Sequence, residues 1–215
     1  MFAGFPPHAL MFYDELELNN SKEHWAAHKQ TYTSSVREPM LALCDALEEE
    51  FGQAKVFRPH RDVRFSADKS PYKNHQGAYV PAGPALGWYV EVSATGVLAG
   101  AGFYQAESSA LKNLRRRIDS PAGTELEQLV ADLRDDGWHL GGDTLLTAPR
   151  GYPKDHPRID LLRHKTIVLS NDYGDDPVIH TTDLLDRVRN DWRRATPLVL
   201  WLTDTLGDTL PQPTD

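Results

Sequence analysis

The chain has 215 residues, a net charge of −8 at pH 7 and one cysteine, Cys44. The acidic balance argues against general nucleic-acid binding, which depends on neutralising phosphates, and no run reaches the ~18 apolar residues of a membrane span. A lone cysteine excludes an internal disulfide, and the N-terminus lacks a signal-peptide pattern. We therefore expect a cytoplasmic protein without a membrane partner, in which Cys44 is a buried apolar residue.

The first half of the chain predicts helices followed by strands. Residues 6–20 and 21–38 carry apolar side chains at helical spacing, with Ser21 as the N-cap of the second helix. Pro39 lacks an N–H and predicts a break, after which a further helix runs to Gly52. Residues 55–59, 62–66 and 77–81 alternate as strands do, and 87–104 predict a hairpin with its turn at 93–96.

The second half returns to helices. Residues 106–120 and 122–137 predict two helices, and 138–142 and 144–153 supply a short strand or two. A helical turn within 156–164 leads into a strand at 165–171, and 180–206 form a long helix that contains Pro197. No repeat or linker interrupts the pattern. We expect one α+β domain over residues 1–210, with a frayed tail at 211–215.

The alternation in the hairpins predicts a mostly antiparallel central sheet, with helices packed mainly on one face. The predicted core side chains each fall on the apolar side of their element: Trp25, Leu43, Leu47, Phe65, Leu129, Leu133, Trp192 and Leu198.

Positive charge is concentrated in residues 55–75, which hold six Lys or Arg and two Asp, within an otherwise acidic chain. A basic island of this kind favours a local anion site. We predict that its side chains bind a phosphate or carboxylate, with arginine offering a planar fork. The predicted ligand-binding residues of the segment are Arg61, Arg64, Lys69, Tyr72 and Lys73.

Asp62 and Asp68 are predicted to hold the arginines in position, and Asp68 is also placed to accept hydrogen bonds from backbone amides ahead of it. The alternative interpretation is a structural ion-pair network that holds an irregular loop, since such networks shift pKa values in the same way as ligand sites do. The excess of positive charge favours the ligand site.

Several motifs resemble one bacterial family of uncharacterised proteins, known as domain of unknown function 2461. They are "FYDELELNNSKEHWAAHKQTY", "RPHRDVRFSADKSPYKNH", "GAGFYQAE", "LKNLRRRI" and "GYPKDHPRIDLLRHKTI", which together span nearly the whole chain. Ala26 replaces a usual aromatic residue and Ala106 a usual proline. The resemblance implies a single α+β domain but no agreed activity, cofactor or substrate. Its last motif adds Arg163 and Lys165 to the predicted site, although basic residues at a helix C-terminus are favoured by the helix dipole alone.

Other chemistries find less support. His24 and His28 are four residues apart on one helix, but the sequence signals no third ligand, so no metal site is predicted. His75 is the better acid–base candidate of the two histidines that flank the basic segment, His60 and His75. Arg115 to Arg117 are interpreted as a solvated helix face, with one of the three as a further candidate for the site. No motif indicates a cofactor, a Walker loop or a hydrolase triad.

Three functions remain open from the sequence. The first is a protein, either a binding protein or an enzyme, that takes an anionic small molecule in a basic pocket. The second is a nucleic-acid-acting protein that stacks bases on Phe65, Tyr72 and Trp88. The third is a protein-interaction module with a structural charge network. The oligomeric state is not indicated.

Overall fold

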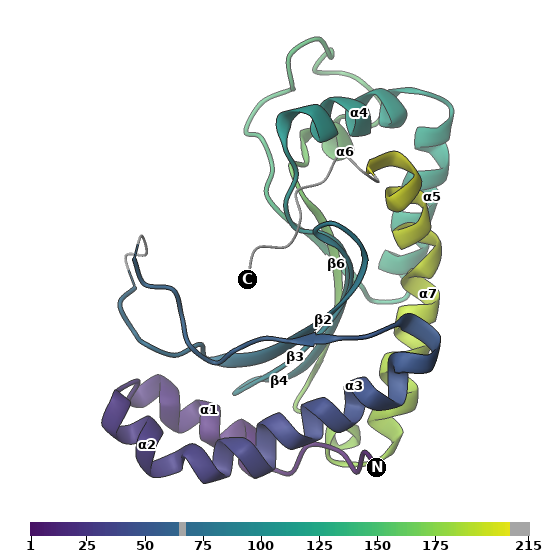
Figure 1. The fold of residues 1–215 in the computed structure, drawn as a ribbon. Helices are drawn as coiled ribbons and strands as arrows, with labels where there is room; N and C mark the ends of the chain where they lie inside the picture. The colour runs from purple at the N-terminus through teal and green to yellow at the C-terminus, as the bar shows by residue number, and fades with distance from the viewer. Residues whose placement is uncertain (65–67, 207–215) are drawn as a thin grey trace. The chain divides into compact units, whose positions relative to one another are not determined.

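The computed structural model of the protein describes residues 1–64 and 68–206 (Figure 1). The helices are α1 (His8–Leu18), α2 (Lys22–Thr31), the π-helix η1 (Tyr32–Arg37), α3 (Glu38–Phe51), α4 (Ser108–Asp119), α5 (Ala122–Asp135), α6 (Ile159–Arg163), the 3-10 helix η2 (Pro177–His180) and α7 (Asp183–Leu206). The strands are β1 (Lys55–Val56), β2 (His75–Gly83), β3 (Leu86–Ser93), β4 (Gly96–Phe103), β5 (His139–Gly141) and β6 (Ile167–Gly174).

The strands form one antiparallel sheet in the order β1-β2-β3-β4-β6-β5, which confirms the predicted α+β fold. The predicted hairpin is present as β3 and β4. Along β3, Val90 and Val92 are buried while Tyr89 and Glu91 are only partly covered, so one face of the strand is the more buried one. At the start of β4, Gly96 has φ 125°, and a Cβ there would meet the backbone of Gly174, so only glycine fits.

Two compact units divide the chain. Unit 1 consists of Met1–Val80, Tyr89–Ala99 and Asp172–Asn190, and unit 2 of Pro81–Trp88, Gly100–Asn171 and Asp191–Asp215. The domain boundary at residue 210 stays a prediction, and the tail 211–215 lies outside the described residues.

In unit 1, helical structure is continuous from residue 22 to residue 51, so the predicted break at Pro39 is wrong. Pro39 lies in the first turn of α3, directly after the π-helical segment η1, in which the N–H of Glu38 donates to the carbonyl of Thr33. The wider π turn accommodates a residue that has no N–H to donate. Ser21 caps α2 as predicted, and Gly52 ends α3.

In unit 2, α4 and α5 bury one apolar face each. Ala110, Leu114 and Ile118 of α4 are buried, as are Leu126 and Leu133 of α5. The indole N–H of Trp201 in α7 donates to the carbonyl of Ala122 at 3.2 Å. The predicted terminal helix is present as α7, and it remains helical through Pro197.

Six of the eight predicted core residues are buried: Trp25, Leu43, Leu47, Leu133, Trp192 and Leu198. Leu129 is only partly buried, because Leu126, Val130 and Leu133 occupy the inner face of α5. Phe65 lies outside the described residues.

Two predicted strands are corrected. Residues 62–64 form no strand, and the rest of the predicted strand at 62–66 lies outside the described part of the chain. Within 144–153 the only pairing described is an isolated bridge between Thr144 and His164. Both segments are rich in charged residues, proline or glycine, whose local hydrogen bonds and fixed φ compete with sheet pairing. None of the described helices has the length and apolarity needed to cross a membrane.

Candidate functional site

The basic segment of unit 1 contains two arginine–aspartate pairs. Arg61 pairs with Asp68. Arg64 pairs with Asp62, with its Nε 3.0 Å from Oδ1 and its Nη2 2.6 Å from Oδ2. The aspartates thus contact the arginines that they were predicted to position. Asp62, Arg64 and Asp68 are exposed and Arg61 is half-buried, and ion pairs at the surface contribute little to stability.

The carboxylates of the basic segment are stabilised as anions. Hydrogen bonds from the Arg64 side chain and backbone lower the pKa of Asp62 to about 2. The pKa of Asp68 is lowered first by Ser70, whose N–H and hydroxyl donate to Oδ1 at 2.9 and 2.6 Å, as predicted for a backbone amide ahead of Asp68. The Lys69 ammonium donates to the carbonyl of Val63 at 2.8 Å. Much of this segment therefore satisfies its own charges.

Tyr72 and Lys73 lie at the end of the basic segment. Tyr72 is buried and stacks on Trp25, and its backbone exchanges hydrogen bonds with the side chain of Asn20. The stacking accounts for the burial of Tyr72 without a ligand. The Lys73 ammonium lies over the Phe57 ring, and burial, followed by the nearby charges of Arg58 and Arg61, lowers the pKa of Lys73. Like charges at this end of the segment are incompletely neutralised.

The remaining two predicted residues belong to unit 2. The Arg163 side chain donates to the carbonyls of Leu145 and Leu146, at 2.8 and 3.3 Å, and lines a small cavity of about 270 Å³. Lys165 is half-buried, and its backbone N–H donates to the carbonyl of Asp143 at 2.7 Å. Because the basic segment lies in unit 1, a single site that includes all seven residues stays a prediction.

A larger cavity in unit 2, of about 730 Å³, carries four cationic side chains. We call it the α4 cavity, and its lining residues are Ser109, Lys112, Asn113, Arg115, Arg116, Arg150 and Tyr152. Among the described residues that line it, none carries a carboxylate.

The regular spacing of α4 builds one wall of this cavity. Ser109, Lys112, Asn113 and Arg116 are three or four residues apart and therefore share one side of the helix. The opposite side holds Leu114 and its buried neighbours, which fix the helix in unit 2. The other wall comes from the loop after β5, which contributes Arg150 and Tyr152.

Hydrogen bonds hold two of the arginines at the α4 cavity. Arg115 Nε donates to the carbonyl of Leu162 at 3.0 Å, and Arg116 donates to the side-chain oxygen of Asn113. Burial lowers the pKa of Arg115, with Tyr152 acting in the opposite direction. Lys112 and Arg150 are exposed, and no ion-pair partner for either is found within residues 1–64 and 68–206.

Tyr152 supplies a hydroxyl to the α4 cavity. Burial raises its pKa, Asp119 acts in the same direction, and Arg115 and Arg116 oppose the shift. The phenol therefore keeps its proton at neutral pH and can donate a hydrogen bond. Its ring meets that of His156 edge to face, with centroids 6.4 Å apart, and His156 Nε2 lies 3.0 Å from Asp119 Oδ1. Asp119 thus holds His156, and the His156 ring holds the ring of Tyr152 in place.

Two of the aromatic residues proposed for base stacking, Tyr72 and Trp88, are buried. Trp88 is buried, and its indole N–H donates to the carbonyl of Trp192 at 3.2 Å. Tyr72 is buried against Trp25, and Phe65 lies outside the described residues. The prediction that Trp88 and Tyr72 form a stacking surface is therefore wrong.

His75 is accompanied by an acidic residue. Its Nε2 lies 3.9 Å from Glu91 Oε2, which also accepts a hydrogen bond from the Tyr89 hydroxyl at 2.5 Å. Burial, followed by Glu91, raises the pKa of Tyr89. The carboxylate of Glu91 that lies beside His75 is already engaged by the Tyr89 hydroxyl.

Sequence reasoning missed the α4 cavity for two reasons. Arg115 to Arg117 have the pattern of a solvated helix face from which one arginine is a candidate for the site, and the spacing of Ser109, Lys112, Asn113 and Arg116 on one side of the helix carries no sign of a cavity. Arg150 and Tyr152 come from an irregular loop that was predicted as strand, and nothing in the sequence places that loop beside α4.

The sequence profile of the conserved hypothetical protein family DUF2461 matches residues 8–201, and the chain belongs to this family. The resemblance noted from its motifs is thereby confirmed. No curated protein matched the chain.

Proposed function

We propose that the protein binds an anionic small molecule, carrying a phosphate or a carboxylate, in the α4 cavity. The observation that supports this most strongly is the gathering of four cationic side chains around a space of about 730 Å³, with no carboxylate among its described lining residues. Cations so arranged repel one another, and a bound anion relieves that repulsion.

The lining residues offer an anion both charged and neutral hydrogen-bond donors. Arg115 is anchored through its Nε by the Leu162 carbonyl, so its guanidinium is already positioned before a ligand arrives. Positioned arginines favour planar oxyanions, because two N–H groups meet two oxygens. Lys112 and Arg150 add charge that no described carboxylate neutralises, and the Tyr152 hydroxyl adds a neutral donor. Phosphate esters and carboxylates match this set.

The basic segment is the second candidate for the same function. Burial and then the nearby charges of Arg58 and Arg61 lower the pKa of Lys73, and these three neighbouring cations favour an anion there. However, Asp68 and Asp62 already pair with Arg61 and Arg64. We therefore rank the basic segment, with Arg61, Arg64, Lys69, Tyr72 and Lys73 as its proposed ligand-binding residues, below the α4 cavity.

The two alternative functions have weaker support. Nucleic-acid binding has to overcome the net charge of −8, and Tyr72 and Trp88 are buried. A protein-interaction role for the basic segment accounts for the arginine–aspartate pairs but leaves the charges of the α4 cavity unexplained.

The experiment is a thermal-shift panel with phosphate, nucleotides, di- and tricarboxylates and single-stranded DNA, followed by titration calorimetry of the best ligand. The test variant is the double substitution Lys112→Gln with Arg150→Gln. The matched control, Arg61→Gln with Arg64→Gln, removes the same charge from unit 1. Because charge-assisted hydrogen bonds are each worth about 1.5–3 kcal/mol, the test variant should weaken binding at least ~10-fold.

The two double variants separate the candidate sites. Loss of affinity in the Lys112 and Arg150 variant, with wild-type affinity in the control, supports the α4 cavity. The opposite pattern assigns the site to the basic segment. An absence of any shift with the small anions, or a shift with single-stranded DNA alone, contradicts the proposed function.

A further inference from the structure

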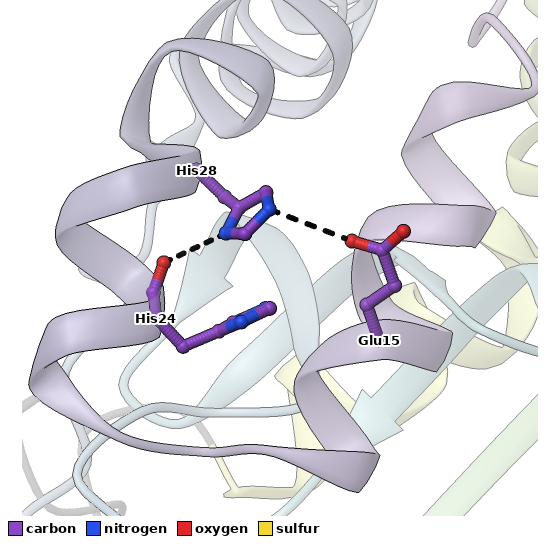
Figure 2. A group of neighbouring side chains, drawn as sticks. All are labelled: Glu15, His24 and His28. Atoms are coloured by element: carbon purple, nitrogen blue, oxygen red, sulfur yellow. Dashed lines mark hydrogen bonds and ion pairs between the residues drawn. The ribbon is translucent and has the colours of Figure 1, made fainter.

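Three candidate metal ligands converge between the first two helices of unit 1. Glu15 lies on α1, and His24 and His28 lie on α2 (Figure 2). Each offers one ligand atom, and these three atoms lie within 4.8 Å of one another. The sequence predicted no metal site because the two histidines had no third partner, and the structure supplies Glu15 from the preceding helix.

The local sequence explains why the three residues meet. A connection of three residues, 19–21, joins α1 to α2, and short connections of this kind make neighbouring helices antiparallel. Ser21 caps α2 by accepting a hydrogen bond from the N–H of His24 at 3.1 Å, which fixes the first turn. Phe12 of α1 and Trp25 of α2 pack edge to face, with ring centroids 5.5 Å apart. This contact holds the two helices together beside the cluster.

The tautomer of the neutral His28 ring places the lone pair of Nε2 toward Glu15. Its Nδ1 lies 2.8 Å from the backbone carbonyl of His24, and a carbonyl can only accept, so Nδ1 carries the proton. In the neutral ring Nε2 is then unprotonated, and it lies 3.9 Å from Glu15 Oε2 (Figure 2). A backbone carbonyl that orients a histidine in this way is one of the usual outer partners of a metal-binding imidazole, together with carboxylates and water.

His24 provides an independent observation. Its Nε2 is buried and has no hydrogen-bond partner within the described residues. Its ring stacks on that of His28, with centroids 4.1 Å apart. A buried polar nitrogen without a partner is costly, and an ion pair between Glu15 and His28 alone does nothing to satisfy it. A cation shared by all three residues does.

We propose that Glu15, His24 and His28 bind a divalent transition-metal ion, with Zn²⁺ as the best match. Two imidazole nitrogens and one carboxylate suit zinc and its neighbours, whereas Ca²⁺ and Mg²⁺ prefer oxygen ligands. Zinc–ligand bonds of ~2.0–2.2 Å in a tetrahedron place ligand atoms roughly 3.4 Å apart, so small side-chain rotations complete the site.

The site is open on one side. The side chains of Glu15 and His28 are 51% and 38% exposed, so the ion can enter from solvent and keep a water molecule as its fourth ligand. Three protein ligands with one open position are the arrangement of zinc sites that bind or activate a further molecule, whereas structural sites are closed by four ligands.

The test is calorimetric titration of Zn²⁺ into the tag-free, chelator-treated protein, with Co²⁺ absorption spectra as a second measurement of ligand geometry. The variants are Glu15→Gln, His24→Gln and His28→Gln. Glu23→Gln and His139→Gln are matched controls, since both residues are exposed and outside the cluster. Each ligand variant should weaken Zn²⁺ binding at least ~10-fold, and the controls should bind as wild type does.

His24→Gln separates the metal site from a simple ion pair, because it leaves Glu15 and His28 in place. One Zn²⁺ per wild-type chain, lost in all three variants, supports the site. Wild-type binding by His24→Gln, equal losses in the controls, or no saturable binding by the wild type overturns it. Circular dichroism in the presence of chelator checks that each variant folds. If a histidine variant does not fold, the Zn²⁺ affinity of Glu15→Gln, a substitution at a half-exposed position, decides the outcome.

Discussion

Trp25 and Tyr72 stack face to face, with ring centroids 4.1 Å apart and ring planes 8° from parallel. The contact joins α2 to the end of the basic segment, within unit 1. It explains why a tyrosine predicted to contact a ligand is buried, and it anchors one end of a segment whose other residues are held by polar contacts.

The Trp25–Tyr72 contact should be measurable as a coupling energy. Trp25→Ala should lower the free energy of unfolding by about 3–5 kcal/mol, because a buried aromatic ring is removed. A double-mutant cycle with Tyr72→Ala should give a coupling of about 0.5–1.5 kcal/mol, as stacked pairs do. Urea unfolding of the four proteins measures both. Strict additivity would show that the two rings do not stabilise each other.

Core and charged residues should differ sharply in their effect on stability. Leu47 is buried in α3, and Leu47→Ala should cost about 2–5 kcal/mol. Arg64 is exposed and pairs with an exposed aspartate, so Arg64→Ala should cost only a small fraction of that. Urea unfolding of both variants makes the comparison. Similar losses in the two would make the basic segment a structural network.

The pKa of Asp62 should depend on Arg64. Its value of about 2 in the folded chain is below the usual ~3.9, so the contribution to stability is complete above ~3.9 and is lost as pH falls toward 2. A carboxyl-detected NMR titration should show Asp62 still ionised at pH 3, and Arg64→Gln should raise its midpoint. Asp68, whose pKa is lowered first by Ser70, should keep its lowered pKa in that variant. An unchanged Asp62 midpoint would refute the pairing.

Cys44 should react slowly in the native protein. It is buried in α3, and burial raises its pKa to about 12, so almost no thiolate is present near neutrality. A thiol reagent at pH 8 should modify it rapidly in guanidinium chloride and far more slowly in buffer. Equal rates would mean that the side chain is accessible in the folded chain.

The fold could be predicted from the sequence wherever local signals agree with packing. The β3–β4 hairpin, the cap at Ser21 and the stop at Gly52 follow from alternation, a hydroxyl and a glycine. The break predicted at Pro39 is absent, because a π-helical turn accommodates the missing N–H. No local sequence pattern indicates such a turn. Residues 62–64 alternate charged and apolar side chains like a strand, yet Asp62 and Arg64 bond to each other locally and the segment does not pair in a sheet.

The sites were harder to predict, because they depend on side chains brought together by the fold. His24 and His28 were visible as a helical pair, but Glu15 joins them only through the packing of α1 on α2. Lys112 lies on α4, and Arg150 comes from a distant loop. The charge density of residues 55–75 is evident from the sequence. Whether its arginines bind a ligand or pair with Asp62 and Asp68 in a structural network could not be decided from the sequence.

The central claim is that the α4 cavity is the anion site, and a crystal structure of the protein soaked in sulfate tests it most directly. We predict a sulfate in the cavity, with its oxygens ~2.7–3.2 Å from nitrogens of Lys112 or Arg150 and of Arg115. Sulfate found only beside Arg61 and Arg64, or a cavity closed by carboxylates that pair with Lys112 and Arg150, would contradict it.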